Sequence, residues 1–167
     1  MLATEQEPAL QSRYAQPFLG EAKRFAGELS AWREAQAAWE SGAAVLHDIS
    51  EGGVYGALWE LGERFGVGME VDLKSIPIRQ ETVEICEFFQ LNPYKLLSTG
   101  SLLVVAEDGN ALASAIRRAG GSAGVVGKVT DTNDRVLLCG EERRFLETAQ
   151  TDELYRILYK TRRKWKE

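Results

Sequence analysis

The stretch 43–65 constrains the fold most, because an apolar run, a polar turn and a helical pattern follow one another within it. The apolar run Ala43–Leu46 predicts a buried strand. Apolar residues then recur at intervals of four, three and four, which is the spacing of one helix face: Val54, Leu58, Leu61 and Phe65. Between the two lies the segment His47–Gly53, the corner at which a predicted strand is followed by a predicted helix.

The His47–Gly53 corner has the composition of an anion-binding site. The first N–H groups of a helix have no partner within the helix, and the helix dipole adds partial positive charge there. Gly52 and Gly53 allow a ligand to approach the backbone closely, which suits a phosphate or a carboxylate. The structural alternative is that Asp48 or Ser50 caps the helix and the glycines only form the turn.

Composition is that of an ordinary globular protein and excludes several classes. A chain of 167 residues with 44% hydrophobic and 27% charged residues suits one domain with a real core. A net charge of −5 argues against general nucleic-acid binding, which needs a basic face. No apolar run reaches the length of a membrane span. The polar, acidic start Met1–Glu7 is unlike a signal peptide, so we expect a cytoplasmic protein.

The two cysteines and the single histidine limit the metal and redox chemistry. Cys86 falls in a helical pattern and Cys139 in a strand pattern, and we expect both to be buried free thiols. Neither has a Cys or His neighbour at metal-ligand spacing, so the sequence predicts no metal site. His47 can change charge near neutral pH, which leaves a proton-transfer role open beside a structural, hydrogen-bonded role.

The rest of the chain alternates predicted helices with predicted strands. We expect residues 1–16 to be poorly determined, with Pro8 and Pro17 interrupting any helix. Further helices are predicted from Phe18 onward, over Ser30–Trp39, around Thr82–Phe89, over Asn110–Ala119 and over Thr151–Lys166. Further strands are predicted around 67–73, 102–106, 125–129 and 135–139, with the last two paired. This order predicts an α/β or α+β sandwich with one mixed sheet.

Two further features of the pattern bear on function. Trp32 and Trp39 fall on one side of a predicted helix, where packing is expected and a surface for another domain is the alternative. Ser98–Gly100 forms a second polar, glycine-containing corner, directly before the strand at 102–106, which is expected to be fully buried.

Several motifs, in their order and spacing, resemble the C-terminal domain of the aminoimidazole ribonucleotide (AIR) synthase-related superfamily. They are the segments 46–58, 66–72, 76–79, 84–89, 92–94 and 98–102. The resemblance extends over about residues 18–139 and includes proteins known as hydrogenase expression/formation factors. It implies an α+β fold in α/β/α layers, with a mixed β-sheet flanked by helices and a partly ferredoxin-like arrangement.

The resemblance also implies an ATP-dependent reaction and an N-terminal domain that this chain lacks. Members of the superfamily use ATP to phosphorylate an amide-type oxygen or a similar acceptor in a small-molecule substrate. Their ATP and magnesium groups lie mostly on an N-terminal domain, which also forms a homodimer, and this chain has no counterpart of that domain. We therefore expect residues 1–40 to be a connector with N-terminal helices and residues 41–167 to be the C-terminal domain. ATP and Mg²⁺ are expected only for the full-length protein, and the isolated domain is expected to be inactive.

The resemblance implies roles at matching positions of the two corners. The catalytic candidates are His47, Asp48 and Glu51, and the candidates for substrate or anion binding are Ser50, Gly52, Gly53, Ser98, Thr99 and Gly100. Hydrogenase-maturation dehydratases of the superfamily react on a C-terminal cysteine, whereas this chain ends in Arg162–Glu167 without one. We therefore expect no carbamoyl dehydration on its own tail. A non-catalytic module that binds a small molecule or a partner on the same scaffold is the alternative function.

Overall fold

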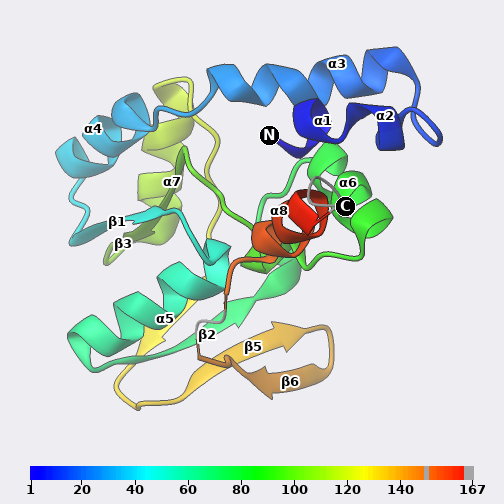
Figure 1. The fold of residues 1–167 in the computed structure, drawn as a ribbon. Helices are drawn as coiled ribbons and strands as arrows, with labels where there is room; N and C mark the ends of the chain where they lie inside the picture. The colour runs from blue at the N-terminus through cyan, green and yellow to red at the C-terminus, as the bar shows by residue number, and fades with distance from the viewer. Residues whose placement is uncertain (149–150, 164–167) are drawn as a thin grey trace.

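The computed structural model describes residues 1–148 and 151–163 (Figure 1). The α-helices are α1 (Leu2–Glu5), α2 (Glu7–Leu10), α3 (Gln16–Arg24), α4 (Trp32–Glu40), α5 (Gly53–Phe65), α6 (Gln80–Phe89), α7 (Gly109–Arg118) and α8 (Glu153–Arg163). The 3₁₀ turns are η1 (Phe25–Gly27), η2 (Leu73–Ser75) and η3 (Pro93–Lys95). The strands are β1 (Val45–Ile49), β2 (Gly68–Asp72), β3 (Ser101–Val105), β4 (Gly127–Thr130), β5 (Arg135–Cys139) and β6 (Glu142–Phe145). Within the described ranges, no helix is long and apolar enough to cross a bilayer.

The strands form two sheets, where the sequence predicts one. β1 and β3 pair antiparallel as a two-stranded sheet, and the mixed sheet has the order β4-β2-β5-β6. The predicted pairing of β4 with β5 is wrong, because β2 lies between them, antiparallel to β4 and parallel to β5. Placing β2 beside β5 brings together the buried Met69, Val71 and Leu137, which favours this order over a local hairpin. β6 was not predicted, because all four of its residues are exposed and show no apolar alternation.

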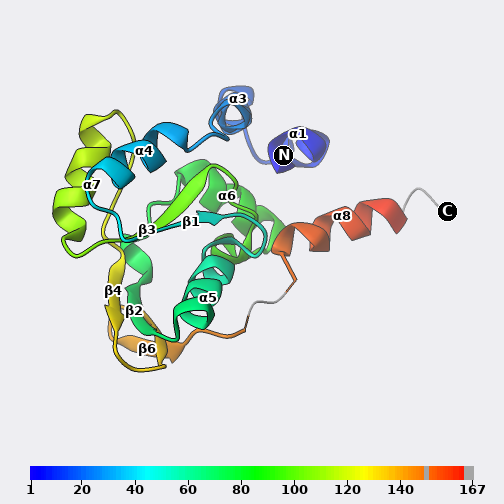
Figure 2. The same cartoon turned by 90° about the vertical axis from the view of Figure 1, so that its left-hand side faces the viewer.

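Helices cover both faces of the two-stranded sheet, giving the predicted α/β/α layers (Figure 2). On one face Leu46 and Val104 pack against α4 and α7, through Ala38 and Leu112. On the other face the sheet meets α5, and α5 in turn packs against β2 and β5 of the mixed sheet. The predicted α+β class, with a mixed sheet flanked by helices, is confirmed. The strand at 102–106 was expected to be fully buried, which is wrong. It corresponds to β3, which is only half-buried and belongs to a sheet of two strands.

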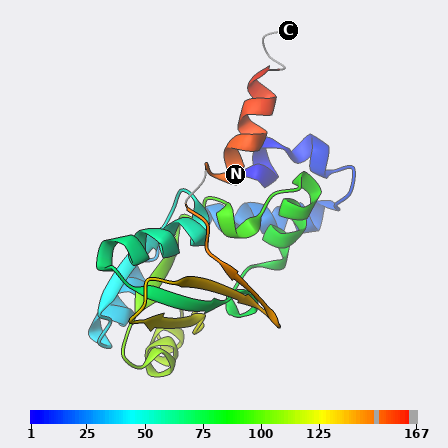
Figure 3. The same ribbon diagram turned by 90° about the horizontal axis from the view of Figure 1, so that it is seen from below.

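The N-terminal residues are ordered into short helices, contrary to the expectation for residues 1–16. α1, α2 and α3 lie together with α6 and α8 (Figure 3). Leu10 and Leu19 are both 0% exposed and belong to the core cluster that these helices share. Pro8 and Pro17 each fall in the first turn of a helix, where the missing N–H is no loss, so proline starts these helices and does not break them.

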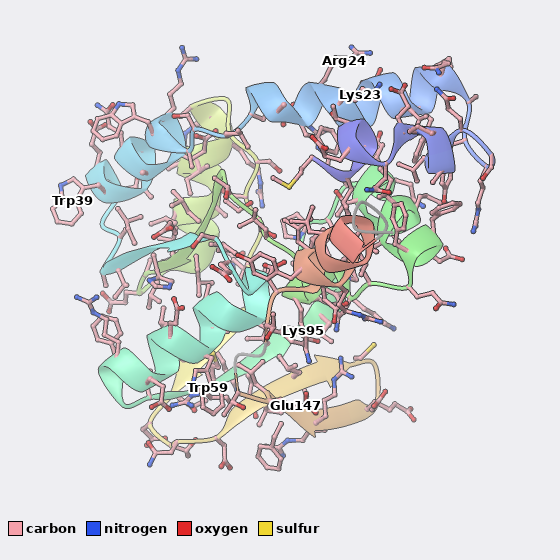
Figure 4. The ribbon with its side chains drawn as sticks, viewed as in Figure 1. Lys23, Arg24, Trp39, Trp59, Lys95 and Glu147 are labelled. Carbon is pink, nitrogen blue, oxygen red and sulfur yellow. The ribbon has the colours of Figure 1, made fainter. Side chains whose placement is uncertain are left out.

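Helix α4 packs through alanine and exposes its tryptophans. Trp32 is 71% and Trp39 70% exposed, so the expected packing role is wrong for both side chains. Figure 4 shows Trp39 pointing away from the rest of the molecule. The buried contact with α7 is made by Ala38, about 100° around the helix axis from Trp39. The helix begins at Trp32, two residues after the predicted start at Ser30.

The two cysteines differ in their environment, although both were expected to be buried. Cys86 on α6 is buried in the N-terminal core cluster, whereas Cys139 at the end of β5 is exposed. Burial, with a smaller effect of the Glu153 charge, raises the pKa of the Cys86 thiol to about 11. Cys139 is exposed because it lies at the end of β5, where it pairs with the exposed Glu142 of β6.

We expect an aromatic disulfide reagent to modify Cys139 rapidly and Cys86 only as fast as the protein unfolds. The thiolate is the reactive form, and at pH 8 Cys86 is both inaccessible and protonated. Release of the chromophore should therefore show one fast thiol in the native chain and two in denaturant. Cys139→Ser should abolish the fast phase, and a fast phase that survives in this variant would contradict the burial of Cys86.

Candidate functional site

The His47–Gly53 corner begins with strand, not with the turn. β1 continues through Ile49, which pairs with Ser101 of β3, so only Ser50, Glu51 and Gly52 form the turn into α5. Adjacent strand residues point to opposite faces of a sheet, so His47 and Asp48 diverge. The structure therefore does not bring together these two predicted catalytic side chains.

His47 faces α5 and forms an ion pair or hydrogen bond there. Its Nε2 lies 2.9 Å from Oε2 of Glu60, two helical turns along α5 from the corner. His47 also lines a pocket of about 240 Å³ with Arg64 and Phe65 of α5. The hydrogen-bonded, structural role that the sequence left open is the one with a contact in the structure.

Asp48 and Glu51 are the exposed carboxylates of the corner. Within residues 1–148 and 151–163, neither side chain makes a hydrogen bond or ion pair. Both remain available to a donor from outside the chain, such as an amide N–H. Their predicted catalytic role stays a prediction.

Both glycines are favoured by their backbone conformation, and Gly53 is also required by close packing against the η3 loop. Gly52 has φ +81° and Gly53 φ +61°, backbone conformations that other residues rarely adopt. A Cβ atom on Gly53 would lie 2.6 Å from the carbonyl oxygen of Leu96 and 2.7 Å from that of Tyr94. The Gly53 N–H donates to the carbonyl oxygen of Ser50 at 3.1 Å, which closes the turn.

The anion position at the start of α5 is occupied by a carboxylate of the same chain. The Gly52 N–H donates to Oδ2 of Asp152 at 2.8 Å, and the Asp152 side chain is buried. Asp152 was not among the predicted site residues. Its only sequence signal is an aspartate directly before an amphipathic helix, which indicates a helix cap and not a partner 100 residues away.

The second predicted corner lies beside the first. The Ser98 N–H donates to the carbonyl oxygen of Ser50 at 3.2 Å, which joins the two loops directly. Ser98 Oγ donates to the Leu96 carbonyl oxygen, while the Thr99 side chain is exposed. Gly100 has φ +95° and packs against the backbone at Glu28. The β1–β3 pairing brings the two corners to the same end of the two-stranded sheet.

A stacked pair of tyrosines lies next to the corners. Tyr55, in the first turn of α5, stacks on Tyr94 with ring centroids 5.5 Å apart. Burial raises the pKa of both phenols above the ordinary value, so both stay protonated near neutral pH. Tyr55 Oη accepts a hydrogen bond from Arg144 at 2.9 Å, and Lys95 forms an ion pair with Glu147 at 3.2 Å (Figure 4).

The chain matches the family described as AIR synthase related protein, C-terminal domain, over residues 7–139. Because this match covers most of the chain, the protein belongs to that family. The fold predicted from the resemblance, like that of the C-terminal domain of AIR synthase-related proteins, is thereby confirmed.

Curated relatives come from two branches. The carbamoyl dehydratase HypE of Rhodobacter capsulatus is 34% identical over 91 residues, which are 52% of this chain and 27% of that protein. The phosphoribosylformylglycinamidine synthase subunit PurL of Thermoanaerobacter sp. (strain X514) is 30% identical over 99 residues, 56% of this chain and 12% of that protein. The chain thus spans only a minor part of the length of these relatives.

Solved structures agree in fold. A crystal structure of E. coli HypE has a TM-score of 0.65 and 23% identity, covering 74% of this chain and 40% of that one. The hydrogenase maturation protein HypE in complex with ATP has a TM-score of 0.60 and 21% identity, covering 66% and 37%. At these identities the likeness concerns the fold alone.

The described residues do not fit a magnesium–triphosphate group. Within residues 1–148 and 151–163, no three His, Cys, Asp or Glu side chains are placed to hold a metal ion. The N–H group of Gly52, which could meet a phosphate, is already bonded to Asp152.

Proposed function

We propose that this chain is the substrate-side domain of an ATP-dependent AIR synthase-like enzyme, which phosphorylates an amide-type oxygen or a similar acceptor. The observation that carries the proposal is the family match over residues 7–139, which includes both polar corners. The carbamoyl dehydratase relatives favour an amide-type acceptor, since a carbamoyl group is an amide. Phosphorylation of such an oxygen makes it a better leaving group, which is the purpose of ATP in a dehydration.

In this proposal the chain contributes positioning and polar groups, not the nucleotide site. Asp48 and Glu51 would accept hydrogen bonds from a substrate, and the backbone of the joined corners would hold its anionic group. In this proposal ATP and Mg²⁺ would bind on an N-terminal domain outside this chain. The HypE relative that is in complex with ATP is a much longer protein than this chain. The homodimer of the full-length protein, its cytoplasmic location and the division at residues 40 and 41 remain part of the proposal.

Asp48→Ala and Glu51→Ala are expected to lower the ATP-dependent activity of the full-length protein by about tenfold or more each. Both side chains are exposed and form no hydrogen bond or ion pair among the described residues, so the thermal unfolding midpoint should not change. The measurement is substrate-dependent phosphate release, beside circular-dichroism melting of each variant.

Asp131→Ala is the matched control, since Asp131 is an exposed carboxylate in the loop between β4 and β5. This variant should keep full activity. Full activity in the two corner variants would reject the proposal, and their unfolding would make the residues structural. A full-length protein that binds a small anion but hydrolyses no ATP would instead favour the non-catalytic binding module.

A further inference from the structure

The chain beyond the family match returns to the candidate site. The match ends at residue 139, and residues 140–148 and 151–163, here named the C-terminal strap, contain β6 and α8. The strap starts at the edge of the mixed sheet, as the neighbour of β5, and its helix α8 lies against α6 and the N-terminal helices (Figure 3). Asp152, directly before α8, lies at the start of α5.

Three polar contacts fasten the first half of the strap, one to β5 and two beside the corner. The Leu146 N–H donates to the carbonyl oxygen of Arg135 at 2.7 Å. Arg144 donates to Tyr55 Oη at 2.9 Å, and Glu147 pairs with Lys95 at 3.2 Å. Tyr55 and Lys95 belong to the first turn of α5 and to η3, the two elements that pack together at Gly53.

Asp152 fastens the strap to the corner itself. It is 2% exposed, and among the residues 1–148 and 151–158 it is the one charged residue that is buried. Oδ2 accepts from the Gly52 N–H and Oδ1 from the Leu154 N–H, both at 2.8 Å. One carboxylate thus caps α8 and at the same time occupies the position at which an external anion would meet the start of α5.

Apolar packing holds the second half of the strap. Leu154 and Ile157 of α8 are buried in the cluster that contains Leu10, Leu19 and Cys86. Arg156 adds a hydrogen bond at 3.3 Å to the carbonyl oxygen of Gln90. The strap is therefore attached on both sides of Asp152, and the Gly52 N–H cannot be reached while Asp152 stays in place.

We propose that the C-terminal strap is an autoinhibitory closure, in which Asp152 stands in for the anionic group of a ligand and must leave before a phosphate or carboxylate can bind at Gly52. This inference rests on the proposed function, because it takes the corner to be a ligand site. Hydrogen bonds to an ionised carboxylate are stronger than those to a neutral amide, so neutralising Asp152 should shift the closed–open equilibrium by roughly tenfold or more.

The test is amide hydrogen exchange and chemical-shift titration of the ¹⁵N-labelled chain with inorganic phosphate, at constant ionic strength set by chloride. In the unaltered chain the Gly52 amide should be protected and should not respond to phosphate. In Asp152→Asn it should exchange at least about tenfold faster and shift saturably with phosphate. Asp108→Asn is the matched control, because Asp108 caps α7 through the N–H groups of Asn110 and Ala111 and lies outside the strap. It should leave Gly52 unchanged.

A second variant guards against a folding defect in Asp152→Asn. Arg144→Met keeps Asp152 but removes the hydrogen bond to Tyr55, and it should also speed the exchange of the Gly52 amide. The inference is overturned if neither variant changes that exchange rate, or if the exposed amide does not respond to phosphate. Phosphate binding gained in Asp152→Asn, with full activity in the Asp48 and Glu51 variants, would uphold the strap and reject the proposed function. No phosphate binding in Asp152→Asn, with reduced activity in the Asp48 and Glu51 variants, would reject the autoinhibitory role of the strap and uphold the proposed function.

Discussion

Gly53→Ala is expected to lower the free energy of unfolding by roughly 3–4 kcal/mol. Part of this loss is backbone strain, because φ at Gly53 is +61° and alanine rarely adopts this conformation. The larger part is steric, since the new Cβ would lie 2.6 Å from the Leu96 carbonyl oxygen and 2.7 Å from that of Tyr94. Both are backbone atoms, so the η3 loop would have to move away from α5. Urea denaturation followed by tryptophan fluorescence measures the change.

Gly66→Ala separates the two contributions to this loss. Gly66 ends the same helix with the same φ of +61°, but nothing lies within 4 Å of its added Cβ. We expect this variant to lose about 1 kcal/mol, which is the strain alone. Equal losses in the two variants would contradict the close packing of the corner on η3, and with it the position of the candidate site.

The local part of the fold could be predicted from the sequence. α5 spans Gly53–Phe65 as predicted, because its apolar residues repeat at helical spacing and Gly66 ends it in a left-handed conformation. β5 also has its predicted bounds, since Arg135–Cys139 is a short apolar run between turn residues. The core buries Leu58 and Leu61 of α5 and Val136 and Leu137 of β5, which carry much of the signal, whereas Phe65 is 48% exposed.

The pairings of distant segments could not be predicted in the same way. The parallel contact of β2 with β5 joins strands more than sixty residues apart, and sequence periodicity carries no information about partners. α1 and α2 are four residues long, too short for a helical repeat to be visible. β6 has no buried residue, so it depends wholly on its neighbour β5.

The candidate site also has a part that local sequence predicts and a part that depends on distant segments. Glycines at a strand-to-helix corner indicate an anion position from local chemistry alone, and binding of a ligand there stays a prediction. In the structure the Gly52 N–H donates to a carboxylate of the same chain. That group is Asp152, whose position is fixed by the packing of α8 on the N-terminal helices. The contact between Ser50 and Ser98 likewise depends on the pairing of β1 with β3.

Leu10→Ala is expected to lower the free energy of unfolding by about 3 kcal/mol. Leu10 is 0% exposed, and its neighbours in the core cluster come from α3, α6 and α8. Truncation leaves a cavity among helices that are held mainly by apolar packing, so the lost transfer energy and the cavity both destabilise the fold. The measurement is the urea midpoint at constant m-value, because an altered m-value would indicate a change in cooperativity.

Leu29→Ala is the control, since the Leu29 side chain is 56% exposed and its loss should stay within about 0.5 kcal/mol. The comparison decides whether the first helices are part of the fold or only an attached connector. Because Leu10 shares its cluster with Leu154 and Ile157, its loss should also loosen α8 and speed exchange at the Gly52 amide. A Leu10→Ala variant as stable as Leu29→Ala would mean that the N-terminal helices do not support the strap, and that Asp152 is held by its polar contacts alone.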